Sequence, residues 1–172
     1  HAALLLHSRQ GKIHIYSGHL LFGRGVPAFH YQSGWMISGY LAQFNWHQWQ
    51  PYFDRFRQVI ASRQSSQRPA SAAENSLRAI KMQFGHLQLF GQDFPRAQVS
   101  VISQSNHYAV SISGPDADGM MAISKRAPHS IIAQFHNLYL RTASLHQQMG
   151  KSINPGLFPP LQLTVKEFRF ND

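Results

Sequence analysis

Residues 80–89 read Ile80-Lys81-Met82-Gln83-Phe84-Gly85-His86-Leu87-Gln88-Leu89, with apolar and polar residues in alternation. The alternation holds from Ile80 to Phe84, one extra residue intervenes, and it resumes at Leu87. A period of two is typical of a β-strand with one apolar face, and an extra residue in mid-run is typical of a β-bulge. At about 3.3 Å per residue, a run of about eleven residues is roughly twice as long as an ordinary strand.

The same apolar pattern recurs along the chain. Two further clear copies are Ile131, Ala133, Phe135, Leu138, Leu140 and Leu161, Leu163, Val165, Phe168, Phe170. Two looser copies are Ile37, Gly39, Leu41, Phe44, Trp46 and Ile13, Ile15, Ser17, Leu20, Phe22. Several such strands side by side would share one extended apolar face. We therefore predict a mainly β fold, in which long bulged antiparallel strands form a curled sheet with an apolar concave face.

Composition sets broad limits on the class of protein. The 172 residues suffice for one domain with a sizeable core, and 43% hydrophobic against 13% charged residues excludes a disordered chain. The net charge of +9, from 16 Lys and Arg against 7 Asp and Glu, could favour nucleic acid, anionic lipid or acidic glycans. The basic residues are scattered along the chain, so we expect no nucleic-acid partner.

The hydrophobic period changes after the first strands. Residues 3–46 have the glycine-punctuated runs of an antiparallel meander. Apolar residues then recur at three- and four-residue intervals, which predicts an amphipathic helix over about 47–62 with Asn45 as its N-cap. The aromatic residues of this helix could anchor it at a membrane interface, but we favour packing of the helix onto the sheet. The helical aromatic cluster is Trp46, Trp49, Tyr52, Phe53 and Phe56.

A polar, serine-rich segment follows the helix, and it predicts a flexible linker over 63–76. We therefore divide the chain into a β-meander with its helix (1–62), the linker, and an antiparallel sheet segment (77–172). Strands are expected near 77–90, 97–103, 107–113, 119–124, 130–140 and 160–170. Residues 114–118 have the composition of a hairpin turn between two of them.

The sequence contains no recognisable catalytic motif. The chain has no cysteine, and its eleven histidines lack the spacing of a metal site. It contains no Gly-x-Ser-x-Gly element, and Gly23-Arg24-Gly25 lacks the rest of a phosphate-binding loop. We expect a protein that is not an enzyme, with no catalytic residue, no metal and no cofactor.

No stretch of the sequence is apolar over the ~18 to 20 residues of a membrane span. The run Ala2 to Leu6 is too short for the core of a signal peptide. The last residues, 168–172, read as part of a strand. We expect an excised piece of a longer protein.

Four segments together resemble one family. They are residues 34–49, which open with Gly34-Trp35-Met36-Ile37-Ser38-Gly39, the turn at 114–119, the strand Phe135-His136-Asn137-Leu138-Tyr139-Leu140, and residues 157–170, which contain Pro159-Pro160-Leu161. Their order and spacing resemble the YhdP-type proteins of the AsmA-like superfamily over roughly residues 10–170. The chain departs from that family in using histidine and glutamine where Asp and Arg are frequent. These motifs are structural, so the family has no catalytic residue to transfer.

The resemblance implies a location and a function. Such proteins are long envelope proteins of Gram-negative bacteria, anchored in the inner membrane by an N-terminal helix and extending through the periplasm. They are thought to carry phospholipid between the two membranes along a groove lined by the apolar face of a β-sheet. The chain would then be an internal or C-terminal-half segment, periplasmic and without the anchor. Its partners would be phospholipid and the neighbouring β-segments of the full-length chain.

The apolar members of the repeats are the residues we expect to line the groove. They are Ile80, Met82, Phe84, Leu87, Leu89, Ile131, Phe135, Leu138, Leu140, Leu161, Leu163, Val165 and Phe168. Three alternatives stay open from the sequence. The apolar face could be a closed core beneath the helix or a second sheet. The chain could be a structural module that extends a longer sheet without touching lipid. It could also be a basic β-domain that binds glycan or nucleic acid.

Overall fold

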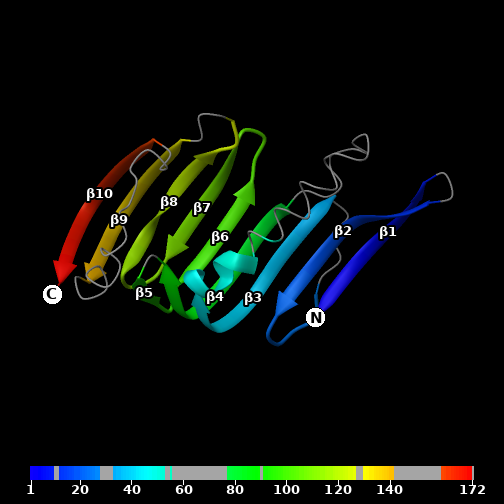
Figure 1. The fold of residues 1–172 in the computed structure, drawn as a ribbon, viewed down its shortest axis with the longest axis horizontal. Coiled ribbons are helices and arrows are strands. Elements are labelled where there is room, and N and C mark those ends of the chain that lie inside the picture. The colour runs from blue at the N-terminus through cyan, green and yellow to red at the C-terminus, as the bar shows by residue number, and fades with distance from the viewer. Residues whose placement is uncertain are drawn as a thin grey trace.

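The computed structural model describes residues 1–9, 12–27, 33–52, 55, 77–89, 91–126, 130–141 and 160–171. Within these residues ten strands form a single open sheet, which confirms the mainly β prediction (Figure 1). The strands are β1 (Ala2–Arg9), β2 (Lys12–Phe22), β3 (Gly34–Asn45), β4 (Leu77–Leu89), β5 (Gln92–Pro95), β6 (Gln98–Ser103), β7 (His107–Ser113), β8 (Ala117–Ser124), β9 (Ile131–Arg141) and β10 (Leu161–Asn171).

The order of strands across the sheet follows the order in the chain. It runs β1-β2-β3-β4-β6-β7-β8-β9-β10, and β5 pairs with β4 beside β6. The strands β1 and β10 therefore lie at opposite edges, as Figure 1 shows. Because β3 pairs with β4, the two predicted parts, 1–62 and 77–172, meet within one sheet. The predicted linker, 63–76, lies outside the described residues.

The prediction of antiparallel pairing is wrong for three of the nine pairings. Six are antiparallel, but β2–β3, β3–β4 and β9–β10 are parallel. Parallel neighbours need a connection long enough to return to the same end of the sheet, commonly a dozen residues or so. The segments 23–33, 46–76 and 142–160 provide that length, whereas the antiparallel strands from β4 to β9 follow one another closely.

The strands after residue 76 lie close to their predicted ranges. The hairpin of β7 and β8 is present, with β8 beginning at Ala117. The short strand β5 was not predicted as a separate element. It is divided from β6 at Arg96, whose φ of 53° is left-handed, yet both strands pair with β4 in the same register.

The extra residue of the repeat occurs in neighbouring strands at the same level. In β3 and β4, Leu41 faces Phe84 before the break and Phe44 faces Leu87 after it. Between β9 and β10, the pair Phe135 and Val165 is likewise followed by Leu138 and Phe168. Register is kept in both cases because both strands contain the extra residue. A shifted register, as expected of a bulge, occurs where β9 meets β8, between Asp118 and Gly119.

The helix begins at residue 46, and residues 46–52 and 55 are helical. The Asn45 side-chain oxygen accepts bonds from the backbone N–H of His47 (2.9 Å) and Gln48 (3.4 Å), which confirms the predicted N-cap. Trp49 stacks on Phe44 of β3, with ring centroids 5.8 Å apart. This contact holds the helix against the sheet beside β3 and β4 (Figure 1). Residues 56–62 of the predicted helix lie outside the described residues.

Candidate functional site: the apolar face of the sheet

One row of directly paired apolar residues crosses the whole sheet. Its members, from β1 to β10, are Ala2, Leu20, Ile37, Ile80, Val101, Val110, Met121, Ala133 and Leu163. Residues paired across adjacent strands project from the same face of a sheet. The apolar face is therefore continuous from one edge of the sheet to the other.

A second row lies on the same face, two residues away from the first row in each strand. It comprises Phe22, Gly39, Met82, Val99, Ile112, Gly119, Phe135 and Val165. Its glycines lie where no side chain fits: a Cβ on Gly39 would approach the Phe22 carbonyl oxygen to 2.0 Å, and one on Gly119 would approach the Gln134 oxygen to 2.5 Å. At Gly119 the ring of Phe135 occupies the space of the missing side chain, at 2.6 Å from the same Cβ position.

The middle of this face is a packed cluster. The cluster is made of Met82, Phe84, Leu87, Phe94, Ala97, Ile112 and Ala117, with Ile37, Leu41, Phe44, Ile80, Leu89, Val99, Phe135, Leu138 and Leu140 packed against it. Three of the predicted residues are buried here, with exposed fractions of 4% for Met82, 8% for Phe84 and 3% for Leu87. Five more predicted residues are half-buried around them, namely Ile80, Leu89, Phe135, Leu138 and Leu140.

The face is open at the β10 edge. Leu161, Leu163, Phe168 and Phe170 are 61%, 48%, 54% and 49% exposed, and Ile131 and Val165 are half-buried. The rings of Phe168 and Phe170 lie 6.2 Å apart on the same side of the strand. No large side chain among the described residues is less than 2% exposed. The structure thus joins the predicted residues into one surface that is buried at its centre and accessible at one edge.

Several residues of the face were absent from the predicted set. The missed residues of β3 belong to the looser repeat. The missed residues between Phe94 and Ala117 lie in strands, or beside strands, that are too short to show the repeat. The missed residues are Ile37, Leu41, Phe44, Phe94, Ala97, Val99, Ile112 and Ala117. The alternation of Val99 and Val101 with serine and glutamine in β6 is the signal that could have revealed part of this group.

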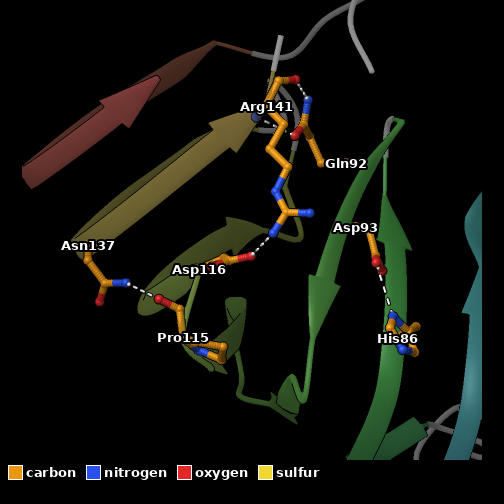
Figure 2. Close-up of polar contacts among 7 residues, drawn as sticks. All are labelled: His86, Gln92, Asp93, Pro115, Asp116, Asn137 and Arg141. Carbon is orange, nitrogen blue, oxygen red and sulfur yellow. Dashed lines mark hydrogen bonds and ion pairs between the residues drawn. The ribbon is translucent and has the colours of Figure 1, made fainter. Parts of the chain in front are cut away.

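The buried side chain of Gln92 is polar yet points to the apolar face, and both ends of its amide group are satisfied. Gln92 is 6% exposed and lies on the same side of β5 as Phe94. Its Nε2 donates to the Arg141 carbonyl oxygen at 3.0 Å, and the Arg141 backbone N–H donates to its Oε1 at 2.9 Å. Figure 2 shows this contact. It connects β5 to the end of β9, although the two strands are not neighbours in the sheet.

The tip of the β7–β8 hairpin is held in the same region. Arg141 forms an ion pair with Asp116 at 3.3 Å, and Asn137 Nδ2 donates to the Pro115 carbonyl oxygen at 3.3 Å (Figure 2). The Tyr139 backbone N–H also donates to the Asp116 carbonyl oxygen at 2.8 Å. These bonds fix the end of β9 against the hairpin, so that the apolar residues of β5, β8 and β9 come together.

Two ion pairs lie on the opposite, outer face. His86 and Asp93 pair at 3.0 Å between β4 and β5, on the side away from Leu87 and Phe94 (Figure 2). On β10 the Arg169 guanidinium donates to Glu167 at 2.5 Å. Hydrogen bonds from Arg169 and, less strongly, from Tyr139 lower the pKa of Glu167 below its ordinary value. The outer face also carries an apolar row, made of Met36, Ala79, Ile102, Ala109, Ala122 and Ile132. The two faces therefore differ chiefly in packing, because the buried cluster lies on the apolar face.

Two other kinds of site are absent from the described ranges. No three His, Asp or Glu side chains there come together as a possible metal site. No helix in the same ranges has the length and apolarity that a membrane crossing requires.

These features define a class of protein: an open β-sheet with long strands and an apolar face that is continuous from β1 to β10. A family model described as YhdP protein matches residues 1–172, so the chain belongs to the YhdP family, as the sequence motifs indicated. This is a family of Gram-negative envelope proteins. Neither the curated proteins nor the solved structures contain a match to the chain.

Proposed function

We propose that the chain is a segment of a periplasmic lipid-transfer protein, in which the apolar face shields the acyl chains of phospholipid between the inner and outer membranes. The observation that carries this proposal is the unbroken row from Ala2 to Leu163, with accessible apolar side chains where it reaches β10. Membership of the YhdP family supports the same function and the periplasmic location. The membrane anchor would be supplied by another part of the full-length protein.

The energetics of lipid transfer favour such a surface. Burying one methylene is worth about 0.8 kcal/mol, so exposing a sixteen-carbon chain to water costs roughly 12 kcal/mol. A surface that shields the chain removes most of this cost. The two rows present similar side chains on strand after strand, so adjacent positions would hold an acyl chain about equally well. A lipid could then slide without being trapped at one point.

The function proposed here needs no enzyme chemistry. Shielding and sliding depend on apolar contact alone, so no catalytic group or cofactor is invoked. Met82, Met121 and the phenylalanines can adjust their packing to a moving chain. Phospholipid and the neighbouring β-segments of the same protein are the proposed partners.

The exposed residues of β10 provide the sharpest test, because they can be changed with little effect on the buried cluster. We expect Leu163→Asp or Phe168→Asp to reduce the phospholipid that co-purifies with the full-length protein severalfold, because a charge would lie in the acyl path. Gln162→Asp and Thr164→Asp, on the other face of the same strand, should leave it unchanged. Organic extraction and mass spectrometry measure the lipid, and equal lipid in all four folded variants would contradict the proposal.

Replacing Phe84 or Phe135 by Asp should also block lipid passage in the full-length protein. Both residues belong to the central part of the face, and Phe84 is only 8% exposed, so the abundance and melting temperature of each variant must be measured alongside. Normal transport by a folded and normally abundant Phe135→Asp variant would show that Phe135 does not line the lipid path.

The second candidate function is a structural module that only extends a longer sheet. It is favoured by the positions of β1 and β10, each of which pairs with one neighbour among the described strands. A folded full-length protein that carries lipid elsewhere, and is insensitive to every substitution on this face, would support the module.

A further inference from the structure

A depression of about 300 Å³ lies at the end of β2, beside β3 and β4, and the lipid-shielding function does not use its polar residues. It is lined by Phe22, Arg24, Gly39, Tyr40, Lys81, Gln83 and Gln98. Lys81 and Gln83 alternate along β4 with Ile80 and Met82 of the apolar face, which places them on the opposite side. Tyr40 is paired with Gln83, and Gln83 with Gln98, so these three side chains form one outer-face row.

Arg24 is placed at this depression by a turn with two left-handed glycines. Gly23 and Gly25, on either side of it, have φ values of 89° and 128°, which favour glycine strongly. A Cβ on Gly23 would lie 3.5 Å from the Tyr40 carbonyl oxygen, so the turn lies directly against β3. The turn begins where β2 ends, at Phe22, while β3 continues to Asn45. The two glycines of Gly23-Arg24-Gly25 therefore allow the turn to pack against β3 and hold Arg24 at the depression.

The two basic side chains of the depression have no acidic partner among the described residues. The carboxylates of Asp93, Asp116 and Glu167 pair with His86, Arg141 and Arg169 instead. Neither Arg24 nor Lys81 forms an ion pair within that part of the chain. Two cations beside two amides and a phenol form a donor-rich surface, which suits an anion with several acceptor oxygens.

We infer that this depression binds a phosphate group, as a free ion or as the ester of a lipid head group. Arg24 would offer its planar guanidinium and Lys81 a point charge, the two residue types most used to bind phosphate. Gln83, Gln98 and Tyr40 would donate to the remaining oxygens. Lys81, Tyr40, Gln83 and Gln98 lie on the face opposite the proposed lipid path, so phosphate binding by these side chains can be tested independently of that function.

Calorimetric titration of the full-length protein tests the site with two probes: inorganic phosphate, and dihexanoyl phosphatidylglycerol below its micelle concentration. We expect Arg24→Gln with Lys81→Gln to weaken binding by at least about tenfold, the loss expected for charge-assisted hydrogen bonds. Lys166→Gln is the matched control, because it removes one exposed positive charge from β10, and it should bind normally. Gln98→Glu, which adds a negative charge at the depression without changing its shape, should also weaken binding.

The two probes distinguish the source of the phosphate. Binding of both, with the same sensitivity to Arg24 and Lys81, would mean that the phosphate group itself is recognised. Sensitive binding of the short-chain lipid alone would assign the site to head groups, and of inorganic phosphate alone to the free ion. If neither probe binds the wild-type protein, or the double variant and Gln98→Glu bind as the wild type does, the inference is wrong.

Discussion

Gln92 shows how a single polar side chain can be accommodated on an apolar face. Its amide group exchanges two hydrogen bonds with the backbone of Arg141, at 3.0 and 2.9 Å, in the manner of one more strand pairing. Leaving a buried polar group without a partner costs about 1–3 kcal/mol, so the residue is tolerated only because both bonds are made. The contact also joins β5 directly to β9, two strands that are not paired in the sheet.

Replacing Gln92 by Leu tests this account. The backbone N–H and carbonyl of Arg141 would lose their partners, and we expect the free energy of unfolding to fall by about 1–3 kcal/mol. Gln134→Leu, an exposed change on β9, should shift it by less than about 0.5 kcal/mol. Urea denaturation measures both variants. Equal stability of the two would show that the Gln92 contact contributes little.

Gly119 and Gly114 form a second matched pair. A Cβ on Gly119 would lie 2.5 Å from the Gln134 carbonyl oxygen and 2.7 Å from the Cα of Phe135, whereas a Cβ on Gly114 would meet nothing closer than 3.4 Å. Gly119→Ala should therefore lower the free energy of unfolding by about 2 kcal/mol or more, and Gly114→Ala by less than about 0.5 kcal/mol. Similar denaturation midpoints for the two variants would contradict the close approach of β8 and β9.

At the scale of elements, the helix depends on its cap as well as on Trp49. We expect Asn45→Ala to weaken the helix by about 1 kcal/mol, because two N–H groups lose their acceptor. Asn45→Asp keeps the acceptor oxygen but loses the bond from Asn45 Nδ2 to Gln88, which is 2.7 Å long. Hydrogen exchange of residues 46–52 should accelerate only in the alanine variant. Equal acceleration in both would assign the effect to the Gln88 bond.

The long strands could be predicted from the sequence because their period of two persists over a whole strand. The repeats beginning at Ile80, Ile131 and Leu161 correspond to β4, β9 and β10. The short strands β5 to β8 show too few alternations, so Phe94 and Ile112 were missed from the apolar face. Strand direction could not be predicted, because alternation is the same in parallel and antiparallel pairs. Strand direction depends instead on the end of the sheet at which the next strand begins, and the long segments after β2, β3 and β9 return the chain to the end where the previous strand began.

Across the whole molecule, the repeat keeps the apolar residues of neighbouring strands on one face. Paired strands carry their apolar residues in register, and β3 with β4 and β9 with β10 also share the position of the extra residue. The apolar face therefore stays continuous where each strand changes phase. A surface of this kind has the form that a path for acyl chains requires, and its central residues are held by packing while those of β10 remain accessible.

The most direct test of a lipid-facing surface is a photo-crosslinking scan along β10 in the full-length protein in cells. A photoreactive residue is placed at each position from 161 to 170, and phospholipid adducts are measured. If this face shields lipid, adducts form at Leu161, Leu163 and Val165, are absent at 166 and 167, and form again at Phe168 and Phe170. Adducts at none of these positions, or equally on both faces of the strand, would contradict lipid shielding by this face.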